Sequence, residues 1–125
     1  MKINIASNEI VHFIGIGGIG MSGLAQIMNN MGFNIQGSDL SQNKNTERLT
    51  KLGIKIFIGH HQKNLKKDTM VVISSAVKKN NGELITARIK KLPVFKRGEM
   101  LANIVALKKN IIIAGSHGKT TIRLI

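Results

Sequence analysis

"VHFIGIGGIGMSG", residues Val11–Gly23, is the stretch that decides the fold class, because its glycines follow the spacing G-x-G-x-x-G. The three glycines are Gly15, Gly17 and Gly20. The run 10–14 before them is rich in β-branched residues and predicts a strand. A glycine loop between a strand and a helix lets the backbone approach a phosphate, with the helix N-terminus facing it. The stretch therefore predicts a phosphate-binding turn at the start of an α/β domain.

Apolar residues at helical spacing follow the glycines and predict a helix with one buried face. They are Leu24, Ile27, Met28 and Met31, and Gly32 is expected to end the helix. Strands that alternate with helices along the whole chain favour an α/β, Rossmann-like, three-layer domain with a mostly parallel sheet and helices on both faces. The further predicted strands are 33–37, 54–59, 70–76, 93–95 and 110–114, and the further predicted helices are 46–52, 80–92 and 97–107.

The caps and buried faces of the two shorter helices can also be predicted. Thr46 is expected to cap the helix over 46–52, with Leu49 and Leu52 on its apolar side and Gly53 after its end. The helix over 80–92 ends before a proline. Its predicted core-facing residues are Ile85, Ile89 and Leu92.

The composition is typical of one soluble globular domain. The chain has 125 residues, 42% of them hydrophobic, and a single Pro. It contains no Cys, which excludes disulfides and cysteine metal sites and fits a reducing cytoplasm. No targeting signal is visible, and the apolar stretch 13–28 is too short and too rich in glycine to cross a membrane. We therefore expect a cytoplasmic protein with no membrane partner.

The formal net charge is +13, from 19 Lys and Arg against six Asp and Glu. Such an excess can indicate a surface for nucleic acid or anionic lipid. Here, however, 15 of the 19 are Lys spread along the chain, and no Trp or Tyr is present to stack on bases. A general bias toward Lys, Ile and Asn accounts for the charge. We expect no nucleic-acid partner, although the positive field favours a phosphorylated ligand.

Asp39 closes the second predicted strand, about 20 residues after Gly20. In a dinucleotide site, an acid at this distance binds the ribose hydroxyls. The pattern therefore leaves open an NAD-binding Rossmann module of a dehydrogenase or of a redox-regulated protein. A tight turn between strand and helix that binds no ligand is the other alternative.

A second phosphate-loop motif, "GSHGKT", occupies Gly115–Thr120. It is a shortened P-loop, because Ile113 stands where the usual motif has its first glycine. In such a loop, backbone N–H groups surround the phosphates, Lys119 neutralises their charge and the Thr120 hydroxyl binds Mg²⁺. An NAD-binding module does not account for this motif. Only residues 121–125 follow the loop, so these 125 residues include neither its helix nor a Walker-B carboxylate.

Histidines and serines near the predicted strand ends are further candidates. His12 lies inside a strand and is expected in the core, whereas His61 is expected in solvent. His60 follows a strand at the edge where open α/β sheets bind their ligands. Ser74 and Ser75 end a strand at the same edge, without the nucleophile elbow or the base that a catalytic serine needs. We therefore expect them to hydrogen-bond a sugar or a phosphate, and we expect no catalytic residue.

The pairing of two phosphate loops resembles the Mur ligase family of peptidoglycan biosynthesis. "GIGGIGMSG" together with "GSHGKTT" is specific to the member that adds L-alanine to UDP-N-acetylmuramate. The resemblance implies an N-terminal domain over 1–114 that binds the UDP part of this substrate rather than NAD. It also implies the start of an ATP-binding loop over 115–125. The matching stretches, in the family's order, are "HFIGIGGIGMSGLA", "GSDL", "IFIGH", "SSAV", "ARIKKLPVFKRGEML" and "IIIAGSHGKTT".

The resemblance also implies roles for residues. The loop 15–20 would meet the diphosphate, Asp39 and His60 the nucleoside, and Arg97 and Glu99 the sugar side or another domain. The implied residues for the UDP-sugar are Gly15, Gly17, Gly18, Ile19, Gly20, Asp39, His60, Ser74, Ser75 and Ala76. The implied residues for ATP are Gly115, Ser116, His117, Gly118, Lys119, Thr120 and Thr121, with Thr120 as the Mg²⁺ ligand.

The sequence departs from the family pattern in a few places. Ile122 and Arg123 stand where further Thr or Ser is usual, Gly98 replaces a common Ala, and Gly82 stands where Pro is frequent. In the family, ATP and Mg²⁺ activate the muramoyl carboxylate for attack by L-alanine. The ATPase and amino-acid-binding domains are not among these 125 residues. We therefore expect a substrate-binding part that holds no cofactor and has no ligase activity by itself.

Overall fold

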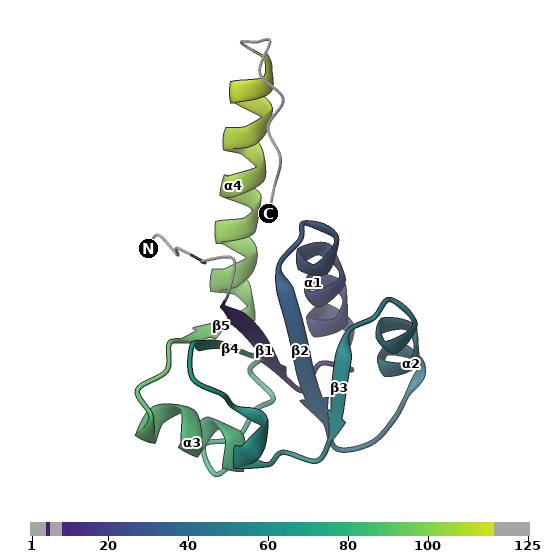
Figure 1. The fold of residues 1–125 in the computed structure, drawn as a ribbon, viewed down its shortest axis with the longest axis vertical. Helices are drawn as coiled ribbons and strands as arrows, with labels where there is room; N and C mark the ends of the chain where they lie inside the picture. The colour runs from purple at the N-terminus through teal and green to yellow at the C-terminus, as the bar shows by residue number, and fades with distance from the viewer. Residues whose placement is uncertain (1–4, 6–8, 117–125) are drawn as a thin grey trace.

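The computed structural model describes residue 5 and residues 9–116, in which strands and helices alternate (Figure 1). The elements are β1 (Ile10–Ile14), α1 (Ile19–Asn30), β2 (Asn34–Asp39), α2 (Lys44–Lys51), β3 (Lys55–Ile58), the single-turn 3-10 helix η1 (Gln62–Asn64), β4 (Thr69–Ile73), α3 (Gly82–Ile89), β5 (Val94–Lys96) and α4 (Arg97–Ser116). The α/β prediction is confirmed.

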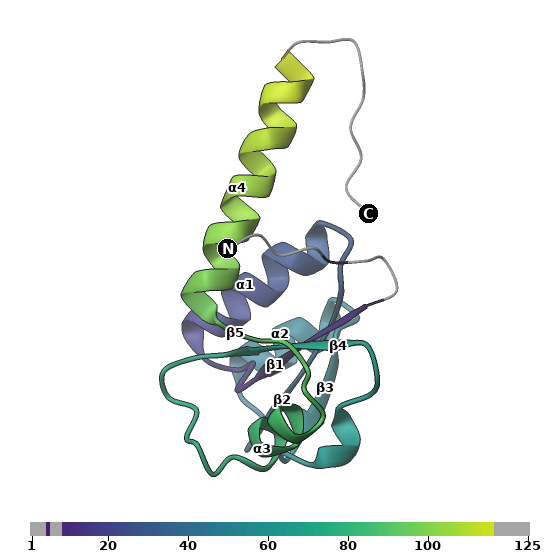
Figure 2. The ribbon, with the colours of Figure 1, turned by 90° about the vertical axis from the view of Figure 1, so that its left-hand side faces the viewer.

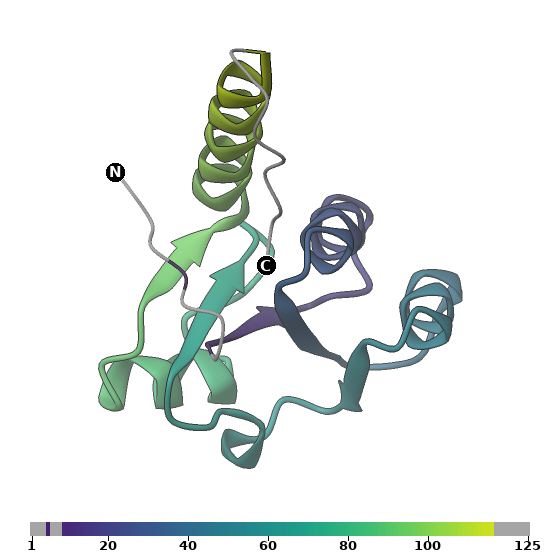
Figure 3. The same cartoon turned by 45° about the horizontal axis from the view of Figure 1, so that its top comes forward.

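The five strands form one parallel sheet in the order β3-β2-β1-β4-β5, with β1 in the centre. In the register of the sheet, His12 of β1 lies beside Gln36 of β2 and Val71 of β4. The helices α1, α2 and α4 lie on one side of the sheet, and α3 and η1 lie on the other (Figure 3). The three-layer arrangement expected from the alternating elements is thus present.

Each face of the sheet has its own apolar cluster, because successive residues of a strand point to opposite faces. Val11 and Phe13 of β1 belong to the larger cluster, which also contains Met28 of α1 and Met100 of α4. Ile14 belongs to the smaller cluster, with Val71, Leu65, Leu84 and Ala87 as its other buried members.

Two predictions about the shorter helices are wrong. The N-cap of α2 is Asn43 rather than Thr46, which is the third helical residue and completes a capping box with Asn43. The side of α3 that faces the sheet carries Glu83 and Leu84, whereas Ile85 and Ile89 are exposed. The spacing of apolar residues predicted the wrong face because the helix directs the carboxylate of Glu83 toward polar side chains of the sheet.

The predicted strand over 110–114 is also wrong, because α4 continues as one helix to Ser116 and extends beyond the sheet (Figure 2). A short apolar run cannot by itself be distinguished from a helical segment. Helical backbone satisfies its hydrogen bonds locally, while a strand needs a partner, and no proline interrupts residues 97–116. Among the residues that the structure describes, no helix is long and apolar enough to cross a membrane.

Candidate functional site

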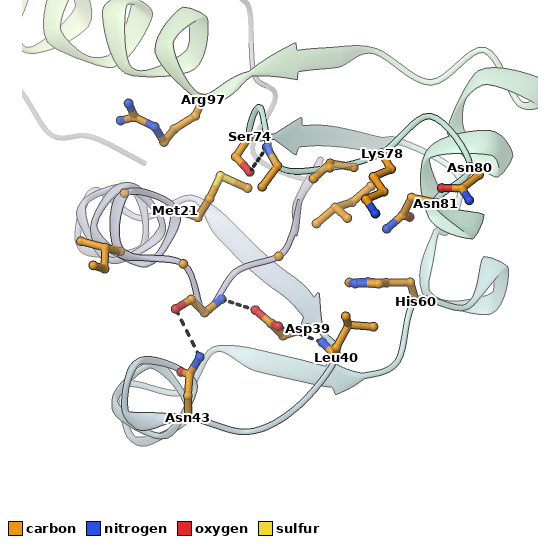
Figure 4. A pocket seen from close by; sticks show the side chains of 18 residues that line it. Met21, Asp39, Leu40, Asn43, His60, Ser74, Lys78, Asn80, Asn81 and Arg97 are labelled. Atoms are coloured by element: carbon orange, nitrogen blue, oxygen red, sulfur yellow. Dashed lines mark hydrogen bonds between the residues drawn. The ribbon is translucent and has the colours of Figure 1, made fainter.

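A pocket of about 680 Å³ opens at the carboxyl edge of the sheet, between the loops that follow β1 and β4 (Figure 4). From β1 the chain passes to α1 on one face, and from β4 it passes to α3 on the other face. This change of direction is the topological switch point where open α/β sheets bind ligands. The volume is within the range of sites for nucleotide-sized molecules.

The glycine loop lines one side of this pocket and leaves the N-terminus of α1 open. Gly15 has a φ of 82°, a conformation that favours glycine, and its N–H donates to the carbonyl of Ser38 at 2.8 Å. Gly18 is the N-cap of α1 and has no side chain to accept the first helical N–H groups. The first turn of α1 contains no acidic residue. The positive end of the helix is therefore available to an anion.

Asp39 holds this loop in place. One carboxylate oxygen accepts the N–H of Gly17 at 2.7 Å, and the other accepts the N–H of Leu40 at 2.8 Å. The loop packs so closely here that a Cβ on Gly17 would lie 2.6 Å from Asn43 Nδ2 and 2.7 Å from Asp39 Oδ2. Asp39, expected at the nucleoside, thus fixes the shape of the glycine loop.

Arg97, the first residue of α4, lies over the start of α1. A Cβ on Gly20 would lie 3.1 Å from both Cδ and Nε of the Arg97 side chain, so the guanidinium covers this glycine. Arg97 lies across the pocket from His60 (Figure 4). A permanent positive charge therefore lies beside the open N-terminus of α1, where it would add to the attraction for an anion.

The loop after β4 supplies the opposite wall. Ser74 accepts the N–H of Ala76 at 3.3 Å, and both residues line the pocket. Asn81 lines it as well, and its side chain caps α3 by accepting the N–H groups of Glu83 and Leu84 at 3.0 and 3.2 Å. The cap thus couples the start of α3 to the pocket wall.

His60 lines the pocket and is joined to a buried polar cluster behind it. Its Nδ1 lies 2.7 Å from Ser38 Oγ, which donates to the carboxylate of Glu83 at 2.5 Å. Glu83 is fully buried and also bonds to His12 Nε2 at 2.9 Å and to Asn64 Nδ2 at 2.6 Å. Burial raises the pKa of the Glu83 carboxyl, but hydrogen bonds from these partners outweigh burial and bring the pKa below its ordinary 4.5.

Sequence reasoning missed this cluster, although a signal was present. His12 was expected in the core and is fully buried, but its ring is hydrogen-bonded at both nitrogens. The polar residues Gln36 and Ser38 are two apart on the neighbouring strand and so share one face of the sheet with His12. Polar side chains at alternate positions of two strands predicted to be buried would have indicated a polar cluster.

The structure brings nearly all the predicted UDP-sugar residues to one pocket. The exception is Ser75, which is exposed and does not line the pocket; His61 is exposed as expected. Glu99 also lies outside the pocket, where its carboxylate accepts the N–H of Lys96 at 2.8 Å. Residues that sequence reasoning did not name, most of them in loops, also line the pocket: Ile14, Met21, Leu40, Asn43, Val77, Lys78, Asn80 and Asn81.

The predicted ATP loop falls mostly outside the described residues. Gly115 and Ser116 are the last residues of α4, and His117, Gly118, Lys119, Thr120 and Thr121 lie beyond the part that the structure describes. Within the described part, no group of three or more His, Asp or Glu side chains is arranged to hold a metal ion.

Known proteins are similar to this chain in sequence. The model of the Mur ligase family, catalytic domain, matches residues 10–109. The UDP-N-acetylmuramate–L-alanine ligase of Pelagibacter ubique is 68% identical over 97% of this chain and 26% of that protein. The ligase of the same name from Rickettsia bellii is 53% identical over 90% of this chain and 24% of that protein. The chain spans about a quarter of the length of these curated relatives.

Solved structures share the fold. The UDP-N-acetylmuramate–alanine ligase of Thermotoga maritima superposes with a TM-score of 0.75 at 34% identity, covering 79% of this chain and 23% of that one. A UDP-N-acetylmuramate:L-alanyl-γ-D-glutamyl-meso-diaminopimelate ligase from Neisseria meningitides gives a TM-score of 0.69 at 29% identity, and the match covers 74% of this chain and 30% of that one. Since the family model matches most of the chain, and ligases of this kind share its sequence and its fold, the chain belongs to the Mur ligase family.

Proposed function

We propose that this chain binds the UDP part of UDP-N-acetylmuramate, as the N-terminal domain of the ligase that adds L-alanine to that substrate. The observation that carries the proposal is the open N-terminus of α1 behind the glycine loop at the switch point of the sheet. The names of the relatives support the choice of a UDP-sugar over a nicotinamide dinucleotide.

The pocket suggests how such a ligand lies. The diphosphate would rest on the first turn of α1, with Arg97 beside it. The nucleoside would extend toward Asp39 and His60, where the side chain of Leu40, 76% exposed, offers an apolar surface for a base. The sugar would then lie along the loop 74–81. Ser74 and Ala76 remain our candidates for contacts on that side.

We also propose that Gly115–Thr121 begins the ATP-binding loop, with domain 1–114 ahead of it. ATP supplies the phosphoryl group that activates a carboxylate, Lys119 would neutralise phosphate charge and Thr120 would ligate Mg²⁺. The sequence contains no Asp or Glu after Glu99. We therefore expect no Mg²⁺-dependent ATP hydrolysis from the 125-residue chain, as measured by phosphate release. Steady turnover above the rate in a Lys119→Ala variant would contradict this expectation.

Calorimetric titration tests the substrate proposal. The chain is titrated with UDP-N-acetylmuramate in one cell and with NADH in a parallel cell. We expect binding of the UDP-sugar alone, weakened about tenfold or more by Gly17→Ala, because the new methyl group displaces Asp39 and Asn43 from the loop. Gly23→Ala, in α1 outside the pocket with no atom near its added Cβ, is the matched control and should bind normally.

Circular dichroism and thermal unfolding show whether each variant keeps its fold. Binding of NADH alone would overturn the proposal in favour of a nicotinamide-binding module. Binding of neither ligand to the folded chain would contradict the proposal that these residues suffice to hold the substrate.

A further inference from the structure

The hydrogen bonds behind His60 join the pocket to the buried core of the sheet, and they converge on the carboxylate of Glu83. The bonds run from His12 through Glu83 and Ser38 to His60, and they cross from the centre of the sheet to its carboxyl edge. The glycine loop is held by other bonds, to the side chains of Asp39, Asn43 and Asn45 and to the carbonyl of Ser38. The direction of each bond can be worked out from the groups that can only accept or only donate.

The protonation of His12 follows from Gln36. The amide nitrogen of Gln36 lies 2.8 Å from the carbonyl oxygen of Asn64, which can only accept, so this end of the amide must be the NH₂ group. The same nitrogen lies 2.8 Å from His12 Nδ1, which therefore accepts. The proton of His12 is then on Nε2, where it is donated to Glu83 at 2.9 Å.

The protonation of His60 follows from Glu83. An ionised carboxylate can only accept, so the Ser38 hydroxyl donates its one proton to Glu83 at 2.5 Å. Ser38 Oγ must then accept from His60 Nδ1, 2.7 Å away. The carboxylate also lies 3.4 Å from that nitrogen, which favours a proton there. With Nδ1 protonated, neutral His60 has a lone pair on Nε2, and its side chain lines the pocket.

We propose that Ser38 and Glu83 hold His60 in its Nδ1–H tautomer, so that Nε2 accepts a hydrogen bond from the nucleoside of the ligand. The donor is either the imide N–H of uracil or a ribose hydroxyl. Ser38 and Glu83 are positioning residues in this arrangement, since they act through His60. The tautomer of a neutral histidine is set by the hydrogen bond of its other nitrogen. The inference about the donor rests on the proposed function, whereas the inference about the tautomer does not.

The tautomer is tested in the ligand-free chain. Imidazole ¹⁵N NMR at about pH 8, above the range where histidine ordinarily titrates, should show His60 with Nδ1 protonated and Nε2 bare. Ser38→Ala should move the population toward Nε2–H, whereas Ser22→Ala, a buried serine in α1 bonded to the carbonyl of Ile19, should not. Glu83→Gln should act in the same direction as Ser38→Ala. An Nε2–H tautomer in the unmodified chain, or no response to either variant, would overturn the proposal.

The ligand donor is tested by titration with UDP, N3-methyl-UDP and UDP analogues that lack the 2′- or 3′-hydroxyl. We expect one of the analogues to bind the unmodified chain about tenfold more weakly than UDP, which is the effect of one lost hydrogen bond. In the Ser38→Ala variant, UDP and this analogue should bind with nearly the same affinity. The affected analogue identifies the donor. Equal binding of all four would overturn the inference about the donor. Failure of UDP itself to bind would instead count against the proposed function and leave the NMR result standing.

Discussion

The two faces of the sheet bury different kinds of side chain. Beneath α1, α2 and α4, the sheet contributes apolar side chains to the larger cluster, and Phe13 and Met28 are fully inaccessible to solvent. Beneath α3 and η1, a smaller apolar cluster shares the face with polar groups. The buried polar residues of that face include a hydrogen-bonded set formed by His12, Gln36, Ser38, Asn64 and Glu83.

The two faces contribute different groups to the pocket. On the apolar side the contribution is backbone, because the N-terminus of α1 and the N–H groups of the glycine loop face the pocket. On the polar side the contribution is a side chain, because His60 lines the pocket and is hydrogen-bonded to buried Ser38. Apolar burial supplies most of the stability, whereas a buried polar cluster supplies orientation provided that each of its groups has a partner.

Truncation of Phe13 should give the largest loss of stability. Phe13→Ala removes a fully buried ring from the larger cluster and should lower the free energy of unfolding by about 3–5 kcal/mol. The control is Phe57→Ala, on the polar side, where the ring is only half-buried. This variant should lose less than half as much free energy of unfolding as Phe13→Ala. Urea unfolding measures both. Equal losses would show that the two faces of the sheet contribute equally to stability, which would contradict the difference described above.

Neutralisation of Glu83 should have the next largest effect. Glu83→Gln keeps the shape of the side chain but turns one acceptor into an NH₂ group facing the donors of Ser38 or Asn64, which should cost about 1–3 kcal/mol near neutral pH. Glu47→Gln, an exposed change in the first turn of α2, should cost less than about 1 kcal/mol. Similar losses in the two variants would mean that the buried cluster is not important for stability.

Low pH should reduce the difference in free energy of unfolding between the Glu83→Gln variant and the unmodified chain. The folded-state pKa of Glu83 lies below its ordinary 4.5, so the ionised carboxylate contributes stability that is fully present above that value. This contribution is lost as the pH falls through the lower folded-state pKa, when the carboxylate takes up a proton. The free energies of unfolding of the two proteins, measured over that range, should therefore converge toward low pH. Parallel profiles would contradict an ionised Glu83.

Gly23→Ala should have the smallest effect and the opposite sign. Gly23 lies within α1, and a Cβ there would meet no atom within 4 Å. Alanine lowers the entropy of the unfolded chain and favours the helix, so we expect a gain of about 0.5–1 kcal/mol in thermal or urea unfolding. A loss would show that α1 packs more tightly on the apolar side than the structure indicates.

Local patterns were enough to predict much of the fold. Every strand from β1 to β5 was expected within a few residues of its bounds, and Gly32 ends α1 with a φ of 96°, as its sequence suggested. Apart from the N-cap of α2, the failures were the buried face of α3 and the end of α4. Both depend on what a segment packs against, which apolar spacing cannot report.

The amino-acid sequence by itself determined the parallel α/β architecture, the glycine loop and some of the residues at the strand ends that line the pocket, because turns and strand ends follow from neighbouring residues. Only the tertiary structure decided that Asp39 holds the loop through Gly17 and that Arg97 covers Gly20. It also decided that Glu83 meets His12, 71 positions away in the chain. The physical reason is that such contacts depend on the order of the strands and the rotation of each helix, which are set by packing of the whole domain rather than by any local pattern.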